Sequence, residues 1–405
     1  MKIKRNRAAY WIALLTIGCL LVPSGITSGN EDTSSDPSLR TSVTNATYAS
    51  KPYDVTVTDS AYPHISMGFG KSAVIDDNES LWVWGGLNTE VSYASSSQPE
   101  LIPLSGVVDA HVGSYNMALL KDGTVWTWSG SHVATGAGQL VDTNDLTALS
   151  SLQNIVQIAG GASHQLALQD NGTVWAWGSN AFGQLGYEGT AHSSVPVQVA
   201  GLSDIVAVSA TGYHSLALTA DGHVWAWGAN DFGQAGNGTA VHSPTPVLVE
   251  GLQQVQAVSA GFYHSIALLQ DGTLMAWGQN NYGELGSGMA DSYSDKPVAV
   301  SLLNDVKSVS AGMYYNLALK SDGSVWAWGA NQYGQSGTGI PQHQSVPVQV
   351  PGLTATSIDA GFYTSGAIGT DGQYYAWGSN AFGQLGHAGA ANAFTPQPLT
   401  SINQQ

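Results

Sequence analysis

The sequence has very little cysteine and very little positive charge. Its single cysteine, Cys19, lies near the amino terminus, so the rest of the chain has no thiol for a disulfide, a thiolate metal site or a cysteine nucleophile. Only 10% of the 405 residues are charged, and 28 acidic residues against 11 basic ones give a net charge of −17. Nucleic acids and anionic membranes both attract Lys and Arg, so the composition argues against both partners. It suits an exported, soluble protein better than one that selects a basic partner.

The first 28 residues differ from the rest and predict an export signal. Four basic residues precede an apolar run of 15 residues, Ala8–Val22, and small and polar residues follow it. This order is typical of a secretory signal peptide, with cleavage expected near Ser28. The run is shorter than the roughly 20 residues of a membrane helix, although an uncleaved anchor stays open as the alternative. Lipidation at Cys19 is less favoured, because apolar residues continue past it.

Residues 29–60 are predicted to form a leader or spacer, and residues 61–405 the folded domain. The leader is rich in Ser, Thr and Asp and shows no amphipathic period, although Tyr53–Thr58 alternates as a strand would. Cleavage after residue 28 removes four basic residues and no acidic one. Seven basic residues then face 28 acidic ones, and the net charge becomes −21.

A three-residue motif that ends in Trp, which we call the Trp step, recurs seven times along the chain, and its first residue is aromatic in most copies. The gaps between successive copies are 44, 49, 50, 50, 51 and 49 residues. A fixed period near fifty indicates one supersecondary unit copied along the chain. Such an array presents a surface of equivalent loops rather than one catalytic cleft. The tryptophans that end the steps are Trp84, Trp128, Trp177, Trp227, Trp277, Trp328 and Trp377.

The repeat at residues 205–250 predicts four short strands. Asp221-Gly222 separates two of them, and Asp-Gly is a strong hairpin signal because a type I′ turn needs positive φ at both central positions. Seven four-stranded units arranged radially form an all-β, seven-bladed β-propeller. Trp225 and Trp227 lie on one side of their strand and are expected to stack between blades. The four strands are expected at Ile205–Ala210, Ser215–Ala220, His223–Gly228 and Pro246–Val249.

A fixed order of short motifs, which recurs from the third repeat onward, resembles that of the regulator-of-chromosome-condensation repeat family. The resemblance covers nearly all of residues 63–400, and it implies a seven-bladed propeller. Repeats 1 and 2 depart from it, because neither Leu87–Glu90 nor Ser129–His132 reproduces the Gly-Gln-Leu-Gly loop. The motifs in the third repeat are Gly160–His164, Ala167-Leu168, Asn171-Gly172, Trp175–Gly178 and Asn180–Gly186.

The resemblance implies several possible functions, and features of this sequence favour some of them over others. Nuclear members are exchange factors for a small GTPase and touch chromatin, a role that the export signal and acidic charge disfavour. Plant members sense ultraviolet light through a Gly-Trp-Arg-His-Thr motif, but Gly212–Ser215 has neither the Trp nor the Arg. Compartment, size and loop character are closest to a secreted bacterial group that inhibits β-lactamases by covering the active site with aromatic loops.

The turn between the first two strands of each repeat carries the candidate site. Equivalent turns should gather at one face around the central channel. Aromatic residues and Met are enriched in protein interfaces, so a partner-binding ring is predicted there, with packing between turns as the alternative. The ring consists of Phe69, Tyr115, Tyr213, Phe262, Tyr263, Met313, Tyr314, Phe362 and Tyr363.

A histidine column follows these turns, and it is predicted to be structural. No carboxylate accompanies the histidines at ligand spacing, so we expect each His to bond backbone in its turn rather than to bind a metal. Nucleophile-elbow and zinc-protease motifs are absent from the sequence. No catalytic residue, metal or other cofactor is therefore expected. The column reads Lys71, Asn116, His164, His214, His264, Tyr315 and Thr364.

These features predict a monomeric, exported, non-catalytic propeller that binds another protein through aromatic loops on one face. The partner would be an extracellular or envelope protein, and enzyme inhibition is one form the binding could take. A cell-wall or carbohydrate binder is the alternative, since aromatic rings also stack on sugars. An enzyme and a nuclear-type exchange factor are less favoured.

Overall fold

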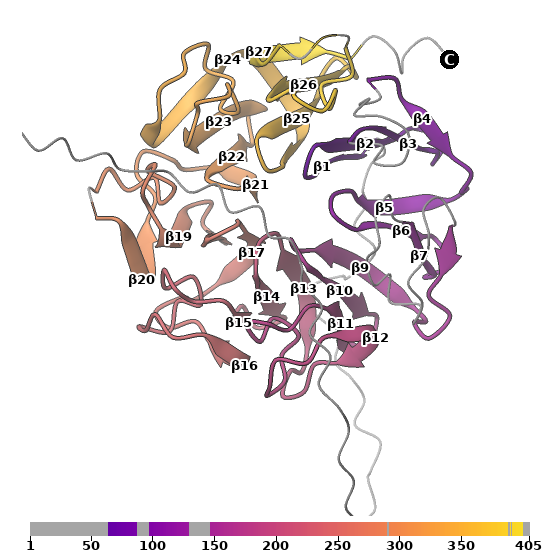
Figure 1. Ribbon diagram of the computed structural model, residues 1–405. Helices are drawn as coiled ribbons and strands as arrows, with labels where there is room; N and C mark the ends of the chain where they lie inside the picture. Colours follow the sequence, from indigo (N-terminus) through magenta and orange to yellow (C-terminus); the bar gives the residue numbers. More distant parts are fainter. Residues whose placement is uncertain are drawn as a thin grey trace, which may run out of the picture. The chain divides into compact units, whose positions relative to one another are not determined.

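Antiparallel strands form seven blades around a central axis (Figure 1). The computed structural model describes residues 64–86, 97–128, 146–289, 291–387, 389 and 391–399. The predicted signal, the leader and the Tyr53–Thr58 segment lie outside these ranges. The described ranges contain strands and no helix, which confirms the all-β propeller. Nor do they hold any helix of the length and apolar character needed to cross a membrane.

Each blade is one continuous stretch of chain. Blade 1 contains β1 (His64–Met67), β2 (Lys71–Ile75), β3 (Leu81–Gly85) and β4 (Glu100–Ile102). Blade 2 contains β5 (Val107–His111), β6 (Asn116–Leu120), β7 (Val125–Trp128) and β8 (Thr147–Ala148). Blade 3 contains β9 (Ile155–Gly160), β10 (His164–Gln169), β11 (Val174–Gly178) and β12 (Ser193–Gln198). Blade 4 contains β13 (Ile205–Ala210), β14 (His214–Thr219), β15 (Val224–Gly228) and β16 (Ser243–Leu248).

The last three blades follow the same order. Blade 5 contains β17 (Val255–Ala260), β18 (His264–Leu269), β19 (Leu274–Gln279) and β20 (Tyr293–Ala299). Blade 6 contains β21 (Val306–Ala311), β22 (Tyr315–Lys320), β23 (Ser324–Gly329) and the first part of β24 (Gln344–Ala360). Blade 7 contains the second part of β24, β25 (Thr364–Gly369), β26 (Tyr374–Gly378) and β27 (Ala393–Pro398). The long strand β24 therefore passes from one blade into the next.

The Asp-Gly turns form the predicted hairpins, but with a different turn type. Between β14 and β15, the Thr219 N–H donates to the His223 carbonyl and the Gly222 N–H donates to the Thr219 carbonyl, both at 2.9 Å. Gly222 has a φ of 85°, whereas Asp221 is not in the left-handed region. One left-handed glycine after a turn is the three-residue hairpin with a bulge, not the type I′ turn. The aspartate instead accepts local hydrogen bonds, such as that from the His223 backbone N–H.

The core consists of apolar residues packed between neighbouring blades. Leu166 and Val174 of blade 3 pack in one cluster with Val208 and Trp227 of blade 4. The second tryptophan of the step is buried in six blades: Trp84, Trp177, Trp227, Trp277, Trp328 and Trp377. The second tryptophan of the step therefore packs between blades, as Trp227 does against Leu166 and Val174.

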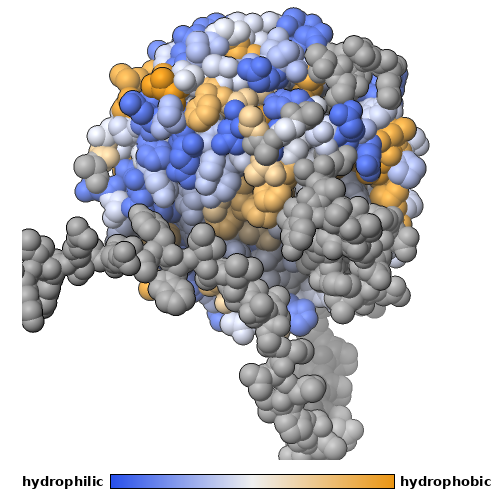
Figure 2. Space-filling model, turned by 45° about the horizontal axis from the view of Figure 1, so that its top comes forward, coloured by the Kyte–Doolittle hydropathy of each residue, from blue (hydrophilic) through white to orange (hydrophobic). Residues whose placement is uncertain are grey.

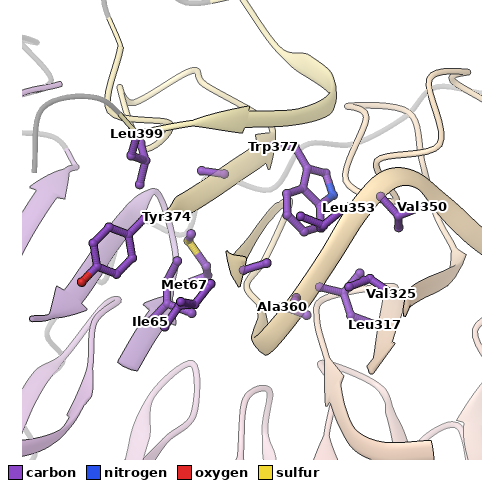
Figure 3. Packing of buried hydrophobic residues seen from close by; sticks show 14 of the residues in the cluster. Ile65, Met67, Leu317, Val325, Val350, Leu353, Ala360, Tyr374, Trp377 and Leu399 are labelled. Carbon is purple, nitrogen blue, oxygen red and sulfur yellow. The ribbon is translucent and has the colours of Figure 1, made fainter. Parts of the chain in front are cut away.

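Blade 1 closes the ring against blade 7 by the same side-by-side packing (Figure 3). Ile65 and Met67 lie in one cluster with Trp377 and Leu399. The Met67 N–H donates to Asp359 Oδ2 at 2.6 Å. Strand β27 pairs with β26, and within the described ranges no strand from the start of the chain joins blade 7.

Candidate aromatic binding face

In blades 3 to 7, whose connections the structure describes almost completely, two sets of connections lie at the same end of the propeller. In an antiparallel four-stranded blade, the turn from the first to the second strand and the loop from the third to the fourth strand share one edge. We call this surface the aromatic face. All nine residues of the predicted ring lie in its first-to-second-strand turns.

The ring residues differ widely in exposure. Phe69 is 47% exposed, whereas Phe262 is 6% exposed and belongs to the core. The other seven are half-buried: Tyr115, Tyr213, Tyr263, Met313, Tyr314, Phe362 and Tyr363. The two sequence interpretations, packing and an accessible face, therefore apply to different members of the ring.

The innermost rings form a chain of edge-on contacts between blades. Tyr213 and Phe262 have ring centroids 5.1 Å apart, Phe262 and Phe362 are 5.2 Å apart, and Phe362 and Phe69 are 4.9 Å apart. These are the T-shaped arrangements that aromatic pairs prefer. Because they join blades 4, 5, 7 and 1, the contacts hold the four turns in fixed positions.

Two ring members lie outside the aromatic contacts of the described residues. The Tyr115 hydroxyl donates to the Ser163 carbonyl at 3.4 Å, and among the described residues no aromatic ring contacts it. Met313 is held through its backbone N–H, which donates to the Gly361 carbonyl at 3.2 Å. Ring contacts thus join six of the nine predicted residues to one another, whereas Tyr363 contacts Tyr333 of a neighbouring loop and Tyr115 and Met313 stay outside.

A second set of aromatic residues surrounds the predicted ring, and sequence reasoning did not include it. Each belongs to a loop between the third and fourth strands and contacts a turn residue. Phe232 lies 5.3 Å from Tyr263, and Tyr333 lies 4.8 Å from Tyr363. The signal was the aromatic position of the Asn-x-aromatic-Gly-Gln-Leu-Gly motif. The set is Phe182, Phe232, Tyr282, Tyr333 and Phe382.

The Gly-Gln-Leu-Gly loops are rigid because their side chains bond their own backbone. In blade 4, Asn230 Oδ1 accepts from the Ala235 N–H at 2.7 Å, and Gln234 Oε1 accepts from the Phe232 N–H at 2.9 Å. The Gln234 carbonyl then accepts from Trp277 Nε1 of blade 5 at 2.8 Å. The loop therefore presents Phe232 from a position fixed by both blades.

The tips of three of these loops add exposed apolar side chains. Val241 is 71%, Met289 52% and Ile340 48% exposed. Their carbonyls accept from the loop asparagines; for example, the Val241 carbonyl accepts from Asn230 Nδ2 at 2.9 Å. Figure 2 shows apolar residues on the surface as separate patches among hydrophilic ones. Small patches on fixed loops provide anchor points rather than a continuous apolar surface.

Burial sets the protonation of the polar groups under this face. It raises the pKa of the Tyr363 hydroxyl to about 12, and neighbouring tyrosines add to the effect. It also raises the pKa of the Tyr314 hydroxyl. Burial raises the pKa of the Glu284 carboxyl to about 7. The tyrosines therefore remain neutral and can donate hydrogen bonds at physiological pH.

The histidine column joins neighbouring blades, and one detail of its prediction was wrong. His164 Nε2 lies 2.8 Å from Ser215 Oγ, His214 Nε2 is equally close to Ser265 Oγ, and His264 Nε2 to Asn316 Oδ1. The ring thus bonds a side chain of the next blade, not backbone in its own turn. Burial lowers the pKa of His164 and His214 to about 3.

The column offers no metal site in the part of the chain that the structure describes. No group of three or more His, Cys, Asp or Glu side chains lies together there as ligands would. Other members of the column serve the same joint between blades. The Tyr315 hydroxyl donates to the Thr364 carbonyl at 2.9 Å, and Lys71 Nζ donates to Asn116 Oδ1 at 3.4 Å.

Comparison with known proteins agrees with this architecture. A family model described as the RCC1-like domain matches residues 86–405. The fold resembles that of Saccharomyces cerevisiae Prp20p, with a TM-score of 0.70 and 22% identity over 80% of this chain and 86% of that one. Yeast RCC1 (Prp20) in its complex with Kap60 has a TM-score of 0.72 and 21% identity, over 90% of this chain and 91% of that one. Human WBSCR16 has a TM-score of 0.67 and 22% identity, over 74% of this chain and 85% of that one.

Proposed function

Because this chain belongs to the RCC1-like domain family, we propose that it is a non-catalytic propeller that binds another protein through its aromatic face. The observation that carries the proposal is the array of half-exposed rings held by fixed turns and loops on that face. Work on the yeast relative describes binding to Gsp1p, histones and Kap60. Protein binding by a propeller of this fold is therefore a known use of it.

The binding mechanism is steric and non-covalent. Aromatic anchors contribute affinity because their rings are removed from water when they pack against the partner. Loops that are already fixed lose little conformational entropy on binding. Hydrogen bonds within the Asn230–Gly236 loop supply that order before the partner arrives. We propose that the protein is exported and that its partner is an extracellular or envelope protein, in one form an enzyme that it inhibits. The basic-rich amino terminus and the apolar Ala8–Val22 run support export.

A comparative capture experiment tests the face. The full chain would be used as bait against the extracellular and envelope fractions of its source, beside a variant with four tyrosines changed to Ala. A second variant, Lys320→Ala, alters the opposite face and serves as the control. We expect one protein to be held by the parent and the control and lost by the tyrosine variant. Equal retention by all three would assign the rings to packing alone. The four tyrosines are Tyr213, Tyr263, Tyr314 and Tyr363.

A cell-wall or carbohydrate binder remains the second candidate, because half-exposed aromatic rings also stack on sugars. Isolated wall glycan offered in the same assay separates the two. Retention of glycan by the parent, with no protein lost by the tyrosine variant, would favour the carbohydrate role. A nuclear-type exchange factor is less favoured because of the net charge of −17 and the predicted export signal.

A further inference from the structure

A cavity of about 200 Å³ lies on the propeller axis, and every blade contributes to its wall. The wall combines the innermost strands with the turns of the aromatic face, including Phe69 and Phe362. The cavity therefore continues the aromatic face into the central channel. A partner that docks on the face also covers the entrance.

The entrance is asymmetric because the turns differ in size. At one turn position, blades 1, 5, 6 and 7 carry a Phe or Met, and the phenylalanines of these turns meet edge-on. At the same position, blades 2, 3 and 4 carry Ser114, Ala162 and Gly212. Ser114 and Ala162 line the cavity. The open side therefore lies toward blades 2–4.

The wall carries carboxylates and no Lys or Arg. Asp359 accepts from the Met67 N–H at 2.6 Å and from Ser310 Oγ at 2.9 Å. Asp109 accepts from the backbone N–H of Ile158. In blades 4 and 5 the bond equivalent to that of Asp359 is made by neutral serines, as when Ser209 Oγ accepts from the Ala260 N–H at 2.9 Å. In blade 3 the bond equivalent to that of Asp109 is made by the neutral Gln157 amide, whose Oε1 accepts from the Val208 N–H at 2.9 Å. The joint between blades therefore does not require a carboxylate.

Burying these carboxyls is costly, and a cation would offset the cost. Burial raises the pKa of both Asp109 and Asp359. Two imidazoles share the wall: His64 favours the charged form of both carboxyls, and burial lowers the pKa of His111 to about 4. Neutral His111 gives the carboxylates no positive charge near pH 7, which leaves His64 alone in the wall to serve two carboxyls. The wall therefore suits a positively charged guest.

We propose that this cavity receives one arginine side chain of the protein that docks on the aromatic face, an inference that rests on the proposed function. A guanidinium group is weakly hydrated, offers five donors and stacks on aromatic rings such as Phe69 and Phe362 at the rim. A compact metal ion suits the wall less well, because no three ligating side chains lie together within the described ranges. The cavity thus binds one basic side chain of the partner, and the aromatic rings contact the partner surface around that side chain.

The first test uses n-butylguanidinium, which reproduces the end of an arginine side chain, in a calorimetric or NMR titration of the full chain at fixed ionic strength. We expect saturable binding by the parent and none of n-butanol. The double variant Asp109→Asn and Asp359→Asn should bind at least about tenfold more weakly, because it removes the charge. Asparagine can keep the structural bonds: its oxygen accepts from the Met67 N–H and its amide donates to Ser310 Oγ.

A steric variant tests the same site without changing its charge. Ala162→Phe should block the entrance, and the fold accepts Phe at this position because Phe262 occupies it in blade 5. The Ala162 and Phe262 N–H groups make the same bond, each donating to a glycine carbonyl of the next blade. Asp322→Asn is the charge control, since Asn171 already holds the equivalent turn. We expect the first variant to lose the probe and the second to bind as the parent does.

The outcomes separate this inference from the proposed function. The variant lacking the four tyrosines should lose the captured partner but keep the probe, because none of those tyrosines lines the cavity. The double variant with Asp109→Asn and Asp359→Asn should lose both the captured partner and the probe. A partner held equally by the parent and the asparagine variant would overturn the arginine inference and leave the aromatic face as the site. Failure of the parent to saturate with the probe, or full binding by Ala162→Phe, would also overturn it.

Discussion

Glu284 occupies a loop position that holds glutamine in the other four described loops of this type. Its side chain is buried; one carboxyl oxygen accepts from the Tyr282 N–H at 2.8 Å, and the other has no partner in the described part of the chain. A carboxylate costs more to bury than an amide of the same shape. Burial accordingly raises the pKa of Glu284 from 4.5 to about 7.

Glu284→Gln should stabilise the protein at neutral pH. Because the folded pKa is the higher one, the free energy of unfolding of the parent falls as the pH rises from 4.5 to about 7 and is constant above that. The variant should lack this fall and be more stable by up to about 3 kcal/mol at pH 8. Urea unfolding at pH 4 and pH 8 measures the effect. A gain of equal size at both pH values would contradict this account. Gln234→Glu is the converse case and should destabilise the protein more at pH 8 than at pH 4.

The two ends of the exposure range within the predicted ring give a second prediction. Phe262→Ala removes a side chain that is 6% exposed and should cost about 3 kcal/mol or more of unfolding free energy. Phe69, at 47% exposed, should cost within about 1 kcal/mol when changed to Ala. Thermal or urea unfolding of both variants tests this difference. Equal losses would show that the rings form one packed unit with no accessible member.

At the scale of elements, the period predicted the strands well because each strand repeats one burial pattern. The strand predicted at Ile205–Ala210 has the bounds of β13, and the outer strand predicted at Pro246–Val249 overlaps β16. The bond from Trp227 to the Gln184 carbonyl could not be predicted. It joins consecutive blades through space, and a repeat pattern does not say which atoms of neighbouring copies meet. The aromatic residues of the loops were missed because only the turn positions were compared.

The indole bond predicts different costs for two equivalent tryptophans. Trp227 Nε1 donates to the Gln184 carbonyl at 2.9 Å, whereas Trp177 Nε1 is buried without a partner in the described ranges. Trp227→Phe should therefore cost about 1 kcal/mol more than Trp177→Phe, since both lose similar packing and only the first loses a hydrogen bond. Urea unfolding of the two variants compares them. A larger loss for Trp177→Phe would show that packing, not the bond, governs this column.

For the whole molecule, the sequence predicted the number of blades but left the ring closure open. The structure closes the ring with the same indole bonds that join the consecutive blades from blade 3 to blade 7. Ser72 Oγ and Trp84 Nε1 of blade 1 donate to the Gln384 carbonyl of blade 7 at 2.8 and 2.9 Å. Ser215 and Trp227 do the same with Gln184 in the middle of the chain. Closure depends on contacts between the first and last repeats, which no local pattern encodes.

This equivalence predicts that the seam between the chain ends can be moved. A circular permutant would join Leu399 to His64 by a linker as long as Val249–Gln254, and would open the chain at Gly251. It should fold cooperatively and keep the aromatic face, because every blade stays one continuous segment and every joint keeps its bonds. A second permutant opened within Asn230–Gly236 should be much less stable, since that loop carries the carbonyl that joins blades 4 and 5. Thermal unfolding followed by tryptophan fluorescence compares both with the parent. If the Gly251 permutant unfolded in two steps, the natural seam would hold a contact that the other joints lack.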